Sequence, residues 1–126
     1  MRLLSKIAVV VPVLVLAAVP GAAMGASKIG SASASGDYAI ALASGTAENP
    51  GTINVRVTAS PRQRVSVSWT MVCSKGLGAG SKSGQFSART TVTRALRKPQ
   101  SNPDSCTVSA SAQLDNGGRV RVTLYG

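Results

Sequence analysis

Few side chains in this 126-residue chain could do chemistry, and the commonest catalytic residue is missing. There is no histidine, so neither a Ser–His nor a Cys–His pair can activate a nucleophile. Of the four acidic residues, Glu48, Asp104 and Asp115 fall in predicted turns, where the two facing carboxylates of a glycosidase are not expected. No lysine has a serine three residues before it, as the Ser-x-x-Lys motif requires. The sequence therefore predicts that the protein is not an enzyme.

The glycine-rich run at 76–83, Gly-Leu-Gly-Ala-Gly-Ser-Lys-Ser, is close to a phosphate-binding loop. That motif requires a glycine where Ser81 stands and a helix after the loop, but Gly84 and a strand-like pattern follow. We therefore interpret 74–84 as a mobile loop between strands. Since the chain also lacks a C-x-x-C pair, we expect neither a metal nor another cofactor.

The two cysteines, Cys73 and Cys106, predict one disulfide if the protein works in an oxidising compartment. Two free buried thiols are the alternative. A disulfide requires the Cα atoms to lie within about 5 to 7 Å of each other. Because Cys73 ends one predicted strand and Cys106 begins another, the chain from 74 to 105 must leave the sheet and return.

Five arginines are the candidate binding residues, because alternation predicts that they project from the outer surfaces of strands. Guanidinium groups suit phosphate and carboxylate partners, and neighbouring strands would join these charges into a cationic stripe. The alternative is a solvated surface whose charge prevents aggregation at strand edges. The five residues are Arg56, Arg64, Arg89, Arg119 and Arg121.

Nucleic acid is not an expected partner. Proteins that bind single strands stack the bases on aromatic side chains, and this chain has few. Trp69, Phe86 and Tyr38 follow patterns typical of a core, which leaves Tyr125. Trp69, on the same side of its strand as Cys73, is expected to pack in the core.

The elements that must position these residues are predicted to be strands, because apolar and polar residues alternate with a period of two and no helical periodicity is convincing. Residues 115–118, Asp-Asn-Gly-Gly, predict a hairpin turn. Tyr38, Ile40 and Leu42 indicate one strand, and 85–96 indicates another. The clearest strands are 53–58, 65–73, 106–114 and 119–125.

The order of the N-terminal residues is that of a secretory signal peptide: two positive charges, an apolar segment over 7–19, then small residues. An uncleaved membrane anchor is the alternative, but a spanning helix needs about 20 apolar residues. We expect a signal peptide at 1–25, a flexible Ser/Ala/Gly-rich tail at 26–36 and a β-sandwich domain at 37–126. Removing Arg2 and Lys6 leaves 12 basic against four acidic residues, a net charge of +8, which favours anionic partners.

Three segments carry a resemblance, namely 65–73, 103–108 and 117–124. In these the chain resembles small secreted β-sandwich proteins of high-GC Gram-positive bacteria, which have one disulfide and no assigned function. In strand count it also resembles the immunoglobulin-like sandwich, from which it departs because Trp69 precedes Cys73 instead of lying between the two cysteines.

Together these observations predict an all-β fold, a small immunoglobulin-like antiparallel sandwich of about six or seven strands after an N-terminal signal helix. We expect a secreted monomer with no stable membrane anchor, which binds an anionic cell-wall polymer or serves structurally at the cell envelope. The alternative is a secreted inhibitor or effector that presents a loop to another protein, with 97–99 and 74–84 as the presenting segments.

Overall fold

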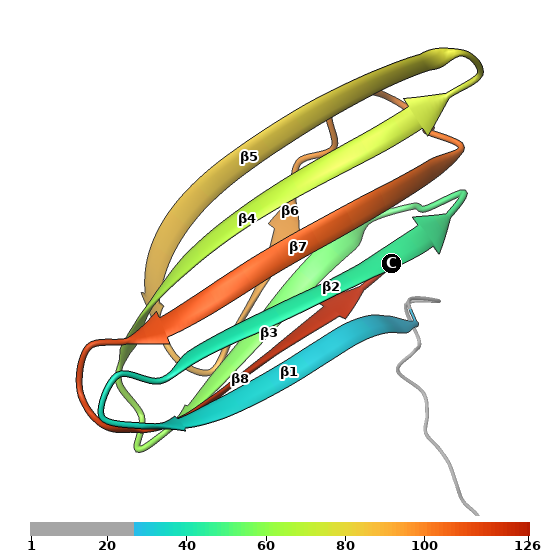
Figure 1. Ribbon diagram of the computed structural model, residues 1–126. Helices are drawn as coiled ribbons and strands as arrows, with labels where there is room; N and C mark the ends of the chain where they lie inside the picture. The colour runs from blue at the N-terminus through green and yellow to red at the C-terminus, as the bar shows by residue number, and fades with distance from the viewer. Residues whose placement is uncertain (1–26) are drawn as a thin grey trace, which may run out of the picture.

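The computed structural model describes residues 27–126, which form two antiparallel four-stranded sheets packed face to face (Figure 1). Sheet I has the order β1-β8-β3-β6 and sheet II the order β2-β7-β4-β5. The predicted all-β sandwich is confirmed, with eight strands instead of six or seven. The predicted signal helix lies outside the described residues. The strands are β1 (Lys28–Gly36), β2 (Ile40–Glu48), β3 (Ile53–Ser60), β4 (Arg64–Lys75), β5 (Gly78–Arg89), β6 (Val92–Leu96), β7 (Ser105–Leu114) and β8 (Gly118–Tyr125).

The strands pair as in one long hairpin that has been rolled up. β4 pairs with β5 at the tip, and β3 with β6, β2 with β7 and β1 with β8 follow outward from it. Rolling this hairpin places alternate pairs in the two sheets, which is the arrangement of an eight-stranded jelly roll. Immunoglobulin domains order their strands differently, so the likeness to them ends at the two-sheet architecture.

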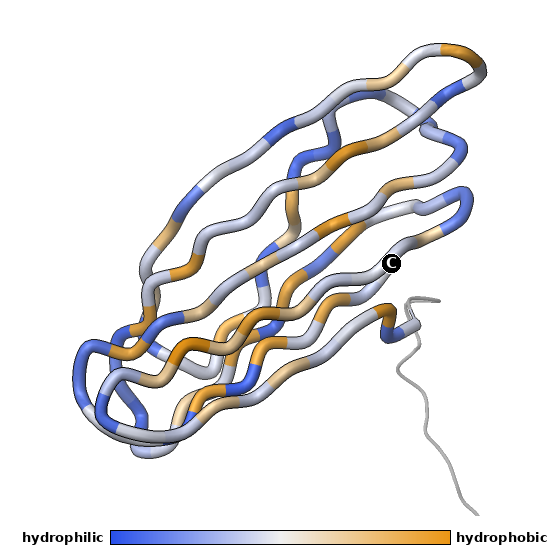
Figure 2. The backbone as a smooth tube through the Cα atoms, in the orientation of Figure 1, coloured by the Kyte–Doolittle hydropathy of each residue, from blue (hydrophilic) through white to orange (hydrophobic). Residues whose placement is uncertain are grey.

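The core lies between the sheets and is built by the alternation that the sequence shows. Val65, Val67, Met71 and Cys73 of β4 are buried, and the residues between them are exposed or only partly buried. The same alternation runs along the other central strands, visible as orange and pale segments in Figure 2. Each fully buried valine or leucine side chain contributes about 1.5 to 3 kcal/mol relative to an exposed one.

The strand predicted around Tyr38 exists as β2, but its two faces are the reverse of those expected. Tyr38, Ile40 and Leu42 are 76%, 55% and 65% exposed, whereas Ala41 and Ala43 are buried. The large side chains suggested a core face, but β2 approaches β1 so closely that a Cβ added to Gly30 or Gly45 would meet backbone atoms, and small residues fill the inward positions of β2. The prediction that Tyr38 belongs to the core is therefore wrong.

Residues 85–96 form parts of two strands, not one. β5 ends at Arg89 in sheet II, and β6 begins at Val92 in sheet I. Between them Thr90 is buried, and its backbone N–H donates to the carbonyl of Gln63 at 3.2 Å. The chain crosses from one sheet to the other at this point, and a period of two cannot reveal such a crossing.

Two segments predicted to be irregular are strands. Residues 74–84 complete β4 and begin β5, paired from Cys73↔Gly80 to Lys75↔Gly78, and the carboxylate of Asp104 accepts a hydrogen bond from the N–H of Gly76 at 2.7 Å. The predicted flexible tail contains β1, which pairs with β8 along its length. In both places small residues suggested a loop, but the backbone N–H and C=O groups form hydrogen bonds with a neighbouring strand.

The disulfide between Cys73 and Cys106 is confirmed, and the alternative of free thiols is wrong. The two residues face each other directly on β4 and β7, with their Cα atoms 4.0 Å apart. As predicted, the chain between them leaves the pair and returns, along β5, β6 and the loop after Leu96. In the described part of the chain no helix is long and apolar enough to span a membrane.

Candidate anion-binding site

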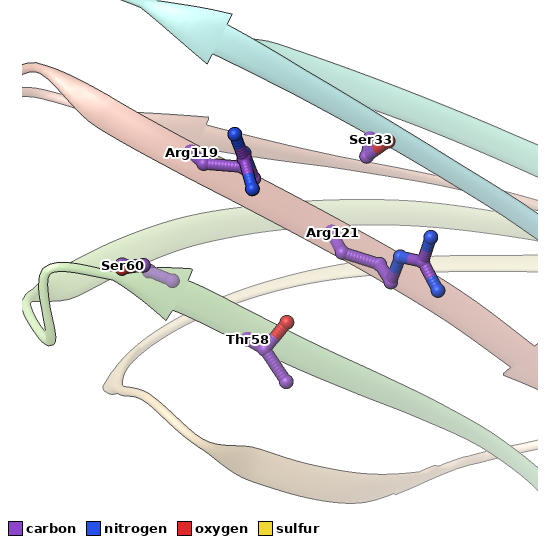
Figure 3. A pocket seen from close by; sticks show the side chains of 6 residues that line it. Ser33, Thr58, Ser60, Arg119 and Arg121 are labelled. Atoms are coloured by element: carbon purple, nitrogen blue, oxygen red, sulfur yellow. The ribbon is translucent and has the colours of Figure 1, made fainter.

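The structure brings Arg56, Arg119 and Arg121 together on the outer face of sheet I. Val120 and Val122 of β8 are fully buried, so the arginines that alternate with them face outward. Figure 3 shows the side chains of Arg119 and Arg121 on the same face of β8, between β1 and β3. On the adjacent β3, Arg56 faces outward between buried valines in the same way.

The strand register determines the spacing of the Cα atoms of these three arginines. Arg119 and Arg121 lie two residues apart, which corresponds to about 7 Å along a strand. Arg121 is paired with Thr58, and Arg56 precedes Thr58 by two residues. This places Arg56 diagonally opposite Arg121, at about 7 to 8 Å between Cα atoms. The Cα atoms of the three arginines therefore follow one another at nearly equal steps across β8 and β3, and we call this group the arginine track.

Two shallow hollows lie along this track and share Arg121 and Thr58. The larger has a volume of about 380 Å³ and is lined by Ser33, Thr58, Ala59, Ser60, Arg119 and Arg121. The smaller, of about 180 Å³, is lined by Arg56, Thr58, Arg121, Thr123 and Tyr125. The track thus combines cations with hydroxyl groups, and both can donate hydrogen bonds to an anion.

The residues beside these arginines do not neutralise them. The positions paired with Arg119 and Arg121 are serines on β1 and a serine and a threonine on β3, and Arg56 is paired with Thr123 and Thr93. None of these partners is acidic. One row of hydroxyls is itself joined, since Ser31 and Thr123 lie 3.3 Å apart, Oγ to Oγ1. The face therefore carries uncompensated positive charge among hydroxyl groups.

The other two predicted arginines, Arg64 and Arg89, lie elsewhere. They are directly opposite each other on β4 and β5, and both face outward on sheet II. The strands carrying the five arginines are thus divided between the two sheets, and no single stripe joins all of them. Only Arg56, Arg119 and Arg121 form a group.

Four further residues line this site and were not predicted from the sequence: Ser33, Thr58, Ser60 and Tyr125. Ser33 was not predicted because the composition of 28–36 indicated a flexible tail and not a strand. The signal that could have found it is the alternation of serine and alanine over 31–35, which has the period of a strand even though no large apolar residue marks it.

The segments suggested for presentation to another protein are held in place. The side-chain amino group of Lys98 donates to the backbone carbonyls of Pro50, at 3.3 Å, and of Gly51. Pro99 is partly buried and packs near Gly80. Residues 74–84 form paired strands, as described above. Lys98 and Pro99 are therefore held against the domain, whereas Leu77, at the tip of the hairpin between β4 and β5, is fully exposed. Within 27–126, no three His, Cys, Asp or Glu residues cluster as a metal site would require.

No protein-family model matches the chain, and no curated protein matches it. Among solved structures it is similar to TmCBM61, a structure described in complex with β-1,4-galactotriose, with 14% sequence identity and a TM-score of 0.45. The similarity covers 71% of this chain and 63% of the other, so the chain spans less than two thirds of that structure's length.

Proposed function

We propose that this chain is an exported, non-catalytic binding domain that holds an anionic cell-envelope polymer against the arginines of sheet I. The observation that carries the proposal is the track of Arg56, Arg119 and Arg121, which lies among hydroxyl groups and has no acidic residue at the paired positions. Such an arrangement favours a ligand with several negative charges, because each guanidinium can form paired hydrogen bonds to a phosphate or carboxylate.

A polymer fits this face better than a small anion does. The hollows are shallow and open, so they would not enclose a small ligand in the way that typical small-molecule sites do. Charges repeated along a flexible chain, by contrast, can bind the three arginines in turn, and each additional contact is then intramolecular. The net charge of +8 expected after removal of the signal peptide adds general attraction to an anionic surface.

Export is part of the same proposal. The N-terminal residues have the pattern of a signal peptide, and the disulfide between Cys73 and Cys106 is typical of proteins outside the cytoplasm. Membership among the small secreted proteins of high-GC Gram-positive bacteria remains a prediction from the sequence.

The first test measures sedimentation of the purified protein with isolated Gram-positive cell walls. We expect Arg119→Ala/Arg121→Ala to raise the apparent Kd by about tenfold or more, because each lost charge-assisted contact is worth about 1.5 kcal/mol before screening. Binding by the unaltered protein should also weaken steeply as salt rises from about 0.05 to 0.5 M.

Arg64→Ala/Arg89→Ala is the matched control, because it removes the same two charges from exposed positions on the other sheet. We expect it to change the Kd by less than about threefold. Equal weakening by the two double variants would mean that only net charge matters, and would overturn the assignment of the site to sheet I.

A further inference from the structure

A second group of side chains lies on the inner face of β5, on the side of the sandwich where the sheets are unequal. β5 has twelve residues, whereas β6, the edge strand of the opposite sheet, has five. Paired residues of neighbouring strands lie on the same face of a sheet. Gly80 is paired with the buried Cys73 of β4 and Lys82 with the buried Met71, so Gly80 and Lys82 lie on the inner face of β5. Much of this face is therefore not covered by a strand of sheet I. Further along the face come Gly84 and Phe86.

Trp69 occupies the space that a side chain at Gly84 would fill. A Cβ added to Gly84 would lie 2.9 Å from three indole atoms of Trp69, Cε2, Cζ2 and Nε1. The indole therefore extends from β4 across to β5 and lies against its backbone. As predicted, it packs against the core, but it is only partly buried. Part of the indole is thus accessible near the middle of β5.

Phe86 and Arg94 form the next pair along the strand. The guanidinium carbon of Arg94, on β6, lies 4.3 Å from the centre of the Phe86 ring. This cation–π contact links the two sheets and restrains an otherwise exposed arginine. Arginine has five N–H donors, and stacking on a ring leaves those at its edge free for a ligand.

Lys82 and Gln100 complete the group on the other side of Trp69. Lys82 is exposed, and the side chain of Gln100 lies over Gly80, 2.6 Å from the position that a Cβ there would take. From Gly80 to Phe86 the strand spans about 20 Å. None of the three strands β4, β5 and β6 contains an acidic residue. We call these residues the β5 row: Trp69, Lys82, Gly84, Phe86, Arg94 and Gln100.

We propose that the β5 row is a second binding site, which takes a polysaccharide containing uronic acids. The C–H face of a pyranose ring packs on an aromatic face such as that of Trp69, and a carboxylate pairs with a lysine or arginine. In the β5 row the aromatic surface lies between Lys82 on one side and Arg94 on the other, so one chain could contact all three. Charge complementarity thus favours an acidic over a neutral glycan. This site is separate from the arginine track on sheet I.

The chain has a single tryptophan, so emission excited at wavelengths where the two tyrosines do not absorb comes from this site. The test is to titrate the protein with oligogalacturonate and, separately, with the neutral maltohexaose. The proposal expects a saturable change in Trp69 emission with oligogalacturonate, and a Kd at least about tenfold higher for the neutral sugar. Lack of any change in emission, or an equal response to both sugars, would overturn it. So would tighter binding of single-stranded oligothymidylate, which would point to nucleic acid instead.

Variants separate this site from the one on sheet I. Lys82→Ala should raise the Kd for oligogalacturonate by about fivefold to tenfold, whereas Lys28→Ala, an equal change of charge at an exposed position of β1, should leave it within about twofold. Arg121→Ala should weaken wall sedimentation but not the fluorescence titration. Equal effects of Lys82→Ala and Lys28→Ala would refute the β5 row while leaving the arginine track untouched.

Discussion

At the scale of single residues, Gly84 and Trp69 depend on each other. The indole lies where the side chain of any other residue at position 84 would be, so glycine is required here for space and not for an unusual backbone conformation. The ring in turn covers the backbone of β5 at Gly84. The position of the only tryptophan is therefore decided by the absence of a side chain on the neighbouring strand.

Gly84→Ala should move the indole, because the new methyl group would lie closer to three of its atoms than real contacts allow. We expect a shift of the tryptophan emission to longer wavelength and a loss of about 1 to 2 kcal/mol in the free energy of unfolding. Fluorescence spectra and urea denaturation measure the two effects. Gly51→Ala serves as the control, since a Cβ there meets nothing within 4 Å. Unchanged emission in Gly84→Ala would contradict the packing described here.

At the scale of elements, the contact between β1 and β2 decides whether the arginine track is complete. β1 is the edge strand of sheet I and supplies Ser33 to the larger hollow. It approaches β2 of the other sheet closely at Gly30 and Gly45, where an added Cβ would collide with the backbone at Ser44 and Ile29, respectively. The sandwich is closed on this side by two glycines, and the strand beside the site depends on that closure.

Gly30→Ala should therefore loosen β1, because backbone atoms of β2 cannot move aside as the end of a flexible side chain can. We expect a loss of about 2 kcal/mol or more in stability and faster amide hydrogen exchange in β1 and along the β8 edge that it covers. Ser35→Ala, on the exposed face of the same strand, should change stability by less than about 0.5 kcal/mol. If Gly30→Ala has the same melting temperature as the unaltered protein, close packing of β1 against β2 at Gly30 does not contribute to the stability of β1.

At the scale of the whole molecule, the disulfide joins the two halves of the rolled hairpin. Cys73 lies near the end of β4, just before the tip, and Cys106 at the start of β7, on the returning half. The described chain is small, and a domain of this size buries a modest fraction of its surface. A covalent link that closes a loop of 33 residues therefore contributes substantially to its stability.

Cys73→Ala/Cys106→Ala should lower the free energy of unfolding by about 3 to 4 kcal/mol, the loop-closure entropy expected for this length. Urea denaturation of the double variant, compared with the oxidised protein, measures the loss. The fold itself should persist in the variant at low temperature, because both cysteines are replaced by a small apolar side chain in the core. A loss below about 1 kcal/mol would mean that the loop is already restrained without the bond.

The strands could be predicted from the sequence where one face is buried in the core and the other is exposed to solvent. Residues 65–73, 106–114 and 119–125 all alternate in this way, and each lies within an observed strand. The two segments of small residues, 28–36 and 74–84, were not predicted, because few large apolar residues mark the inward face of either segment. The faces of β2 were reversed for a related reason, since alanines, and not Ile40 or Leu42, fill its inward positions.

The direction in which each side chain points is a local property, because successive residues of a strand face opposite ways. The sequence by itself therefore determined that Arg56, Arg119 and Arg121 point outward and that Cys73 points toward the core. Which strands are neighbours depends instead on how the long hairpin rolls, and contacts between residues far apart in the chain decide this. Only the tertiary structure shows that β8 lies beside β3 and that Arg64 and Arg89 lie on the other sheet. It alone also shows that the partly buried Trp69 packs against Gly84.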